Sequence, residues 1–415
     1  MPQKVNLYQW KSARCLRLKV AVGSSLLVWG LVTASAATGN IRINEIMVNN
    51  AHCTNVDGSV TPWVELLNVS ASASVNLLGY SLTDSNTYPL RYVFNWDVTI
   101  PPRGLYLITC DSNKPASPTN MPFGLGKNGG YVYLHTNFTA VDYIQYGLQP
   151  VDYSIGRVPD GLGSFYLCTP TMRGTNQSVA LGSQGVLKLN EWMADDGNDP
   201  DWFEIYNSTN KPVPLTGLIF YVHQDNLISY VIPSLSFIGC SNASAWQQFI
   251  CDKSVPQDPY QVNHLNISLS KKAETLIMEY RTGTVFDSCS FTNSEQHVSE
   301  GRCPDGSSNI VRFYGAGDNP GSSPGAPNTI LLTNLIVSEL LTHADLPLEN
   351  AVEFQNRGPT NVDISGWWIS NDRLSPMKAR IPPGPVIPPG GFRVIYQYMF
   401  NTNLSQTPQY PADYP

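Results

Sequence analysis

The same short set of residues occurs three times along the chain. An acidic residue opens each copy, at Glu45, Glu191 and Glu339. A second acidic residue follows, with an asparagine shortly after it: Glu65 with Asn68, Glu204 with Asn207, and Glu353 with Asn356. A glycine turn comes next, at Gly79, Gly217 and Gly366. Such a repeat indicates a tandem array of one small domain, and it favours binding or scaffolding over a single large active site.

The second half of the repeat is present only in the first two copies. The turn Gly-Arg-Val-Pro-Asp-Gly at 156–161 corresponds to Gly-Arg-Cys-Pro-Asp-Gly at 301–306, and Asp142 corresponds to Asp287. The third copy matches the others only as far as a strand-like run at 392–396. We therefore predict three units: copy one at residues 41–180, copy two at residues 187–328, and an incomplete copy three at residues 334–415.

Several of these motifs resemble the lamin-tail domain, an immunoglobulin-like β-sandwich. The matching elements in copy one are Asn44-Glu45, Trp63-Val64-Glu65, the run Leu-Gly-Tyr-Ser-Leu-Thr-Asp at 78–84, and Ile100-Pro101 before a hydrophobic strand. The Gly-Arg-x-Pro-Asp-Gly turn is similar to that of the secreted bacterial members. The resemblance implies an all-β protein of tandem immunoglobulin-like sandwiches, with the third copy incomplete.

Composition points to the same fold class without the resemblance. Charged residues make up only 14% of the chain, against 42% hydrophobic residues, while soluble domains average about 25% charged residues. The 32 glycines and 32 prolines are spread along the chain, as frequent turns between short strands require. No long amphipathic helical period with both caps is present, so we expect strands throughout.

The N-terminus has the three parts of a secretion signal. Basic residues lie at 4–19, an apolar run follows at 20–32, and Ala34-Ser35-Ala36 offers a small-x-small cleavage site. We predict a signal peptide at residues 1–36, because the apolar run is shorter than the ~20 residues of a membrane-spanning helix. The mature protein would then be secreted or held at the cell surface, with no stable membrane span.

Seven cysteines follow the predicted signal and suit an exported protein. Three bridges are compatible with their spacing: Cys53–Cys110, Cys240–Cys251 and Cys289–Cys303. Because seven is an odd number, one cysteine would stay unpaired, and we assign Cys168 as that residue. The alternative is that several of these residues are small buried apolar side chains, and sequence alone does not choose between the two.

The sequence contains no convincing catalytic or cofactor-binding constellation. Gly321-Ser322-Ser323-Pro324-Gly325 has the form of a nucleophile elbow, but loop residues flank it where a strand and a helix are needed. We expect no enzyme activity and no cofactor. The one metal candidate is an acidic turn whose hard oxygen atoms suit calcium, although we favour a solvated turn; its residues are Asp195, Asp196, Asn198, Asp199 and Asp201.

The repeated charged and amide residues allow a structural and a functional interpretation. The structural one pairs the turn arginines with strand glutamates and lets the asparagines support the next turn. The functional one makes the carboxylates a ligand-binding set. We favour the structural interpretation for these residues: Glu45, Glu65, Asn68, Arg157, Glu191, Glu204, Asn207, Arg302, Glu339, Glu353 and Asn356.

Two functional classes fit these observations. The first is a non-catalytic secreted or cell-surface binding or scaffold protein, whose ligand is an extracellular protein or polysaccharide. The second is the accessory N-terminal portion of a larger surface enzyme with a hydrolase, nuclease or kinase-like module. Nucleic-acid binding is disfavoured, because the formal net charge is −7 and the isoelectric point is about 5.4, with no basic stripe to neutralise phosphates.

Overall fold

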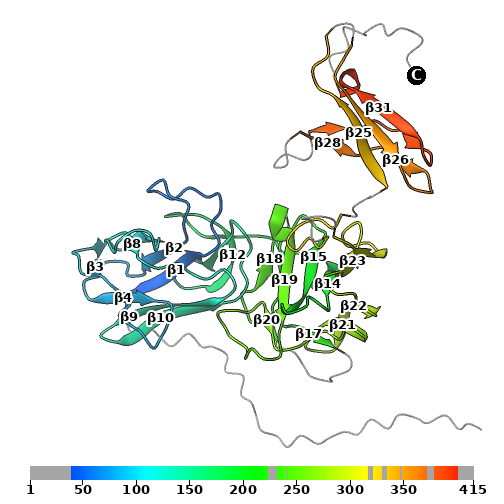
Figure 1. Ribbon diagram of the computed structural model, residues 1–415. Coiled ribbons are helices and arrows are strands. Elements are labelled where there is room, and N and C mark those ends of the chain that lie inside the picture. Colours follow the sequence, from blue (N-terminus) through cyan, green and yellow to red (C-terminus); the bar gives the residue numbers. More distant parts are fainter. Residues whose placement is uncertain are drawn as a thin grey trace, which may run out of the picture.

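Short strands joined by tight turns form almost all of the chain in the computed structural model (Figure 1). The structure describes residues 39–222, 231–240, 242–315, 321–329, 334–345, 348–371 and 378–400. The predicted signal peptide and the end of copy three lie outside these ranges. The domain limits predicted above stay predictions.

Copy one is a sandwich of two main sheets. Its strands are β1 (Ile41–Met47), β2 (Trp63–Asn68), β3 (Val75–Asn76), β4 (Tyr80–Thr83), β5 (Tyr92–Val93), β6 (Thr99–Ile100), β7 (Leu105–Cys110), β8 (Asn120–Met121), β9 (Gly130–Thr136), β10 (Thr139–Tyr146), β11 (Ser154–Val158), β12 (Ser164–Thr169) and β13 (Gln177–Ser178). One sheet has the order β13-β12-β11-β1-β2-β7-β8, and the other has the order β10-β9-β4-β5. β3 pairs with β6 in a small separate ladder.

Copy two repeats this arrangement with the same strand neighbours. Its elements are the 3-10 helix η1 (Gln184–Val186), β14 (Leu187–Met193), β15 (Asp201–Asn207), β16 (Val213–Pro214), β17 (Leu218–Val222), β18 (Phe237–Ile238), η2 (Asn242–Ala245), β19 (Trp246–Cys251), β20 (His264–Leu265), β21 (Ala273–Tyr280), β22 (Thr284–Thr292), β23 (Ser299–Arg302) and β24 (Ile310–Phe313). Its sheets have the orders β20-β19-β15-β14-β23-β24, β17-β21-β22 and β16-β18. Therefore β14, β15 and β23 stand where copy one has β1, β2 and β11.

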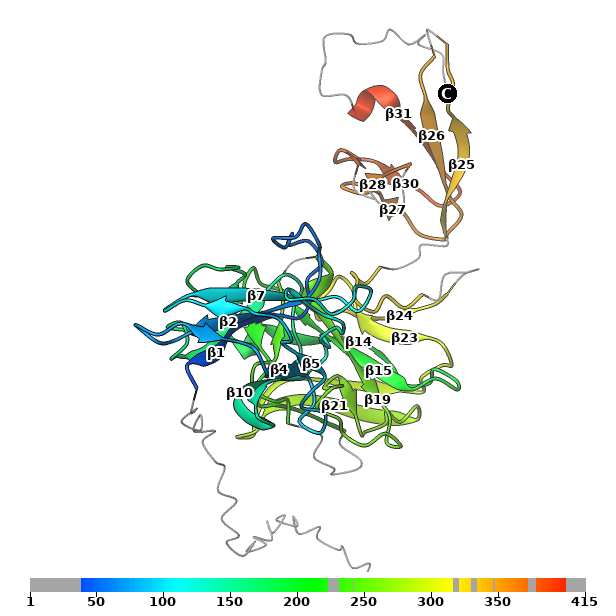
Figure 2. The same cartoon turned by 90° about the vertical axis from the view of Figure 1, so that its left-hand side faces the viewer.

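Copy three contains only the first part of the pattern in the residues described. Its elements are β25 (Leu335–Leu341), β26 (Ala351–Asn356), β27 (Val362–Asp363), β28 (Trp368–Ile369), β29 (Ala379–Arg380), β30 (Val386–Ile387), β31 (Phe392–Tyr396) and η3 (Gln397–Phe400). They form the sheets β25-β26-β31, β27-β30 and β28-β29. Figures 1 and 2 both show this unit standing apart from the other two.

Alternation of side chains along each strand builds the two large cores. In β9, Val132 and Leu134 face the core of copy one, while Tyr131 and Tyr133 face outward, as the two-residue period of a strand requires. The core of copy two contains a cluster of three aromatic rings, Phe203, Phe220 and Phe249, with centroids 4.7–5.2 Å apart. Copy three has only four fully buried core residues in its described part, all isoleucines.

The two complete copies are joined by backbone hydrogen bonds as well as by the chain between them. Phe237 N donates to Leu148 O (2.8 Å) and Val262 N donates to Asn128 O (2.9 Å). Leu148 of copy one packs into the core of copy two. The contact also needs a glycine at position 147, because a Cβ there would lie 1.8 Å from Ser236 Oγ. Copies one and two are therefore in direct contact rather than independent units on a flexible linker.

Cysteine packing contradicts the disulfide pairs that spacing allowed. In the described part of the chain, none of the seven cysteines forms a disulfide. Cys110 faces the main core of copy one, whereas Cys53 packs with Trp63 and Leu107 on the opposite face of the same sheet. Likewise Cys251 lies in the core of copy two, while Cys240 lies near the Tyr153 hydroxyl (3.7 Å). The alternative of small buried side chains applies to four of them, Cys110, Cys168, Cys251 and Cys289.

Candidate functional site

A pair of buried glutamates lies at the same place in both complete copies. Glu45 on β1 is directly opposite Glu65 on β2, and Glu191 on β14 is directly opposite Glu204 on β15. A β-bulge immediately before the first glutamate shifts the register, between Ile43 and Glu45 and at the matching position in copy two. All four side chains are fully buried.

The carboxylates of copy one are held by a strand and a loop from the second half of the repeat. Glu45 accepts hydrogen bonds from Ser154 Oγ on β11 (2.5 Å) and from both the backbone N and Oγ1 of Thr171. Glu65 accepts from Arg173 N (2.5 Å) and from Asn44 Nδ2 (3.0 Å). We name residues 171–176 and their counterpart 323–328 the clasp loops.

Copy two repeats this arrangement with different residue types. Glu191 accepts hydrogen bonds from Ser299 Oγ (2.6 Å) and from the N and Oγ of Ser323, and Glu204 accepts from Gly325 N (2.5 Å). The Gly-x-Ser-x-Gly motif is thus part of a clasp loop, and its serine hydroxyl is engaged with Glu191 and Asn328. Its geometry is that of a structural contact rather than of a nucleophile.

Burial changes the protonation of these glutamates. Desolvation raises the pKa of Glu45 to about 7 and that of Glu204 to about 8, and it also raises the pKa values of Glu65 and Glu191. Asn190 lies beside Glu204, but its amide donates to Asp305 (2.9 Å). Among the described residues no donor is well placed for Glu204 Oε1, and burial is the main cause of the raised pKa, which favours the protonated carboxyl group near neutral pH.

The prediction that the turn arginines pair with glutamates is wrong, because their partners are aspartates on the facing sheet. Arg157 donates to Asp142 (2.9 Å), to Ile43 O and to Gly163 O. Arg302 repeats this with Asp287 (3.1 Å), Leu189 O and Ser307 O. Hydroxyl and amide donors hold the glutamates, apart from Glu204 Oε1, and the guanidinium groups instead tie the two sheets together.

The three repeated asparagines contact the turn that follows their strand. The Nδ2 of Asn68 donates to the carbonyls of Ala73, Ile100 and Pro101. Asn207 Nδ2 donates to Lys211 O and Gly239 O, and Asn356 Nδ2 donates to Thr360 O and Ile387 O. Each amide oxygen also accepts a backbone N–H two residues further on. These amides fasten the first connection of every copy to the large sheet.

The acidic turn of copy two directs its carboxylates to separate partners. Asp195 pairs with Lys271 (3.1 Å), Asp196 with His297 (3.1 Å), and Asp201 accepts a hydrogen bond from Leu269 N (2.9 Å). Over the part of the chain that the structure describes, no cluster of three or more acidic, histidine or cysteine side chains could hold a metal ion. Burial raises the pKa of Asp201 to about 6.

In copy three the corresponding acidic pair lies open. Glu339 on β25 faces Glu353 on β26 in the same register, again after a bulge. However, Glu339 is exposed and Glu353 is half-buried, and the hydroxyl of Ser338 donates to Glu353 Oε1 (2.7 Å). No strand or clasp loop covers them within residues 334–345, 348–371 and 378–400.

A second site candidate is a row of tyrosines on the outer face of β9 and β10. Tyr133 stacks on Tyr131 at 5.5 Å and on Tyr143 at 5.6 Å, between ring centroids. Tyr260 of copy two packs edge-on against Tyr131 (5.6 Å) and donates its hydroxyl to Asp84 O (2.9 Å). We call these four residues the tyrosine surface, and it spans the contact between the two complete copies.

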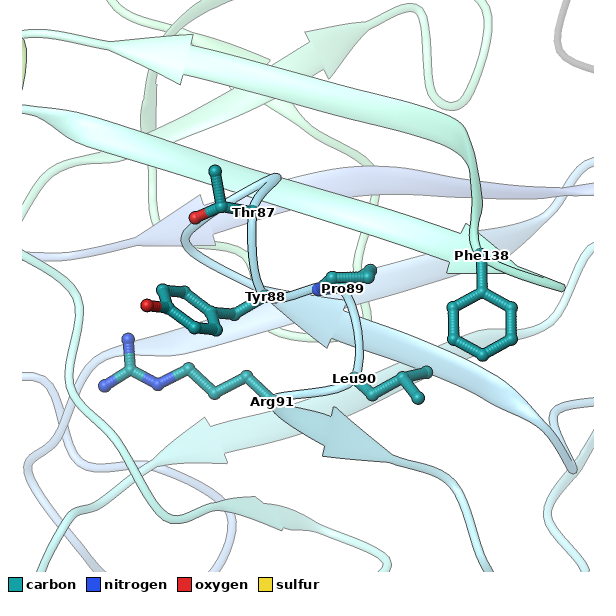
Figure 3. A pocket seen from close by; sticks show the side chains of 6 residues that line it. All are labelled: Thr87, Tyr88, Pro89, Leu90, Arg91 and Phe138. Carbon is teal, nitrogen blue, oxygen red and sulfur yellow. The ribbon is translucent and has the colours of Figure 1, made fainter.

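An apolar hollow lies beside the tyrosine surface. The loop between β4 and β5 covers the outer face of β4, where Ser81 Oγ donates to Pro89 O (2.6 Å). Together with Phe138 at the β9–β10 turn, this loop lines a hollow of about 630 Å³ (Figure 3). Tyr88 and Phe138 are 71% and 70% exposed and line the same hollow, and adjoining exposed apolar side chains mark candidate interaction surfaces. Arg91 forms an ion pair with Asp84 at the base of the loop.

Sequence reasoning missed both the aspartate partners and the tyrosine surface. The correspondence of Asp142 with Asp287 was visible in the repeat, but their contact with the arginines depends on how the two sheets face each other. The alternation of Tyr131 and Tyr133 within one strand was a usable signal, because alternate residues share a face. Tyr260 carried no signal, since it lies in the other copy.

Comparison with known families supports the first copy directly. Residues 34–147 match the family described as Lamin Tail Domain, so copy one contains a lamin-tail domain, an immunoglobulin-like β-sandwich. Copy two shares its strand order and register, so the chain is an array of tandem sandwiches of this kind. No curated protein matched the chain.

The family match gives a general functional class. A lamin-tail domain is a module of binding or scaffolding character rather than a catalytic one. Among the described residues, none belongs to a helix long and apolar enough to span a membrane.

Proposed function

We propose that the protein is a secreted or cell-surface, non-catalytic binding protein that holds a protein partner on the tyrosine surface. The observation that carries this proposal is the aromatic area in which Tyr143, Tyr88 and Phe138 are exposed and the stacked Tyr131 and Tyr133 are half-buried. Export is inferred from the basic, apolar and small-residue segments of residues 1–36.

The chemistry of the surface favours a protein ligand. Because the rings of Tyr131, Tyr133 and Tyr143 stack on one another, their hydroxyl-bearing edges are the parts left to meet a ligand. In the described part of the chain, these three hydroxyls have no hydrogen-bonding partner. Tyrosine and arginine are common anchor residues of protein interfaces. A tyrosine ring buries apolar area against the partner, while its hydroxyl can form a hydrogen bond. Arg91 lies beside this surface.

The test measures how much of the purified chain binds to intact cells. A double substitution, Tyr133→Ala with Tyr143→Ala, should weaken binding at least tenfold, the effect of about 1.4 kcal/mol. Tyr166→Ala is the matched control, since Tyr166 is 49% exposed on the other sheet of copy one. Protease treatment of the surfaces should abolish retention, and glycosidase treatment should not.

Two outcomes would contradict the proposal. Retention that survives protease but not glycosidase would assign a polysaccharide ligand instead. Equal loss for Tyr166→Ala and the double variant would show that the tyrosine surface is not the contact.

A further inference from the structure

One asparagine at the contact between copies one and two is followed directly by a glycine. It is Asn128, and Asn128-Gly129 is the only Asn-Gly pair in the chain. Asn128 lies in the turn that leads into β9 and is half-buried. Its side chain reaches copy two only through a long contact, from Nδ2 to Gln261 Oε1 (3.5 Å). The side-chain amide is therefore loosely held and open to reaction.

The packing of the two copies requires the glycine. A Cβ at position 129 would lie 2.5 Å from Pro259 O and 2.8 Å from Val262 Cγ2, both of which belong to copy two. The φ of Gly129 is also positive, at 126°, a conformation that side chains other than glycine's rarely allow. Close approach of the copies thus fixes a glycine directly after Asn128.

An asparagine followed by glycine is prone to lose its side-chain amide without an enzyme. The backbone nitrogen of the glycine attacks Cγ of the asparagine, a new N–Cγ bond forms, and the Cγ–Nδ2 bond breaks. The attacking nitrogen gives up its proton, and Nδ2 leaves as ammonia. Glycine hinders this attack least because it has no side chain. Water then opens the succinimide ring at either carbonyl, which yields aspartate or isoaspartate.

Backbone hydrogen bonds on both sides of this turn make its main-chain path important. Val262 N of copy two donates to Asn128 O (2.9 Å). One residue earlier, Gln149 N donates to Lys127 O (2.9 Å). In isoaspartate the main chain runs through Cβ and Cγ, so it is one atom longer and the carbonyl that meets Val262 moves. The new carboxylate also replaces the amide donor that faces Gln261 Oε1.

We infer that Asn128 is a site of spontaneous deamidation, and that its conversion to isoaspartate loosens the contact of residues 259–263 with copy one. The reaction needs no reactant besides water. Tyr260 lies in this segment, where its ring packs against Tyr131 and its hydroxyl donates to Asp84 O. Ageing of the chain therefore reaches the tyrosine surface, whatever that surface binds.

The first experiment maps deamidation in the whole chain. The chain is incubated in mildly alkaline buffer at body temperature, digested with pepsin in acid, and mapped by mass spectrometry. Asn128 should convert roughly tenfold faster than Asn137, because Asn137 is exposed in the β9–β10 turn but precedes the bulky Phe138. A protein isoaspartate methyltransferase should methylate the peptide that contains position 128.

Hydrogen exchange then shows whether the product alters the contact. Exchange of residues 259–263 should rise when the unmodified chain is incubated. It should not change on incubation of Asn128→Gln, because glutamine closes the corresponding larger ring much more slowly. Asn128→Asp should have a smaller effect than the aged chain, since it adds the charge but keeps the length of the main chain.

Three results would overturn the inference. One is equal conversion of Asn128 and Asn137, and another is unchanged exchange of residues 259–263 in a chain whose Asn128 is fully converted. The third is conversion in a synthetic peptide of residues 121–136 but not in the whole chain, because the fold would then keep Cγ of Asn128 away from the nitrogen of Gly129.

Discussion

Glu191 and Glu204 lie opposite each other on neighbouring strands, with both carboxyl groups fully buried. A buried pair of this kind is tolerated when donors satisfy one carboxylate and burial keeps the other protonated. The hydroxyl of Ser299 and the clasp loop satisfy Glu191, and the raised pKa of Glu204 keeps it protonated. The clasp loop therefore links the end of copy two to its first two strands.

The raised pKa values predict a stability that falls as pH rises. Glutamate in an unfolded chain titrates near pH ~4.3, while Glu204 in the folded chain has a pKa of about 8. The folded state thus binds more protons in this window, so its free energy of unfolding decreases from about pH 5 to pH 8. Glu204→Gln should flatten this dependence, as measured by urea midpoints at several pH values.

Glu295→Gln provides the control for this series. Glu295 lies in an exposed ion pair with Arg312 (2.6 Å), so its removal should leave the slope of stability against pH unchanged. Equal slopes for the unmodified chain and Glu204→Gln would show that Glu204 is ionised in the folded protein.

Removing a turn arginine should strongly destabilise its own copy. Arg302→Ala removes the nearer of the two cations beside the buried Asp287 carboxylate, where Lys188 Nζ remains at 3.7 Å, and leaves the hydrogen bonds to Leu189 O and Ser307 O unmade. The expected loss is about 2–3 kcal/mol, because Asp287 keeps only the more distant cation and two carbonyls lose a charged donor. Arg302→Lys should recover little, since an ammonium cannot direct donors along all three directions. Urea unfolding followed by the fluorescence of Trp192 would measure both, and an unchanged midpoint would contradict the assignment.

Thiol accessibility should separate the cysteines into two groups. Cys110, Cys251 and Cys289 are buried in the two cores, where burial raises their thiol pKa values. They should react with iodoacetamide only after unfolding, while Cys53, Cys240 and Cys303 should react sooner. Mass spectrometry of the non-reduced, alkylated protein should detect no crosslinked cysteine peptides. A Cys53–Cys110 peptide would refute the packing described for the first sheet.

Adding a side chain at position 147 should disrupt the contact between copies one and two. A Cβ there would collide with Ser236 Oγ (1.8 Å). We expect Gly147→Ala to raise hydrogen exchange in residues 231–238 of copy two. Gly124→Ala is the matched control, because no atom lies within 4 Å of a Cβ at that position. Unchanged exchange in Gly147→Ala would show that this contact does not hold the copies together.

The repeat in the sequence predicted the fold well because its anchors mark strands and turns. Gly79, Gly217 and Gly366 all adopt positive φ values, of 83°, 80° and 79°, a conformation that strongly favours glycine. The pairing of Glu45 with Glu65 was harder to predict. The bulge beside Asn44 shifts the register by one residue, and a bulge has no clear sequence signal when it does not contain glycine.

The ion-pair partners of the turn arginines could not be predicted from the sequence, because they depend on how the two sheets pack. Arg157 and Asp142 lie on different sheets, so their contact depends on the angle and spacing of the two layers. The choice between disulfides and small buried side chains was open for the same reason, since the face of β7 that carries Cys110 decides its neighbours. The tyrosine surface combines residues of two copies, and its fourth ring depends on how those copies pack.

The central claim is that β11 or β23, with its clasp loop, covers the acidic pair of each complete copy, while no strand of copy three covers its pair within the residues that the structure describes. Hydrogen exchange of the whole chain, read by mass spectrometry over residues 41–47, 187–193 and 335–341, tests it most directly. The first two segments, β1 and β14, are predicted to be strongly protected, and β25 is predicted to exchange far faster. Protection of residues 335–341 equal to that of β1 and β14, in the isolated chain, would contradict the claim.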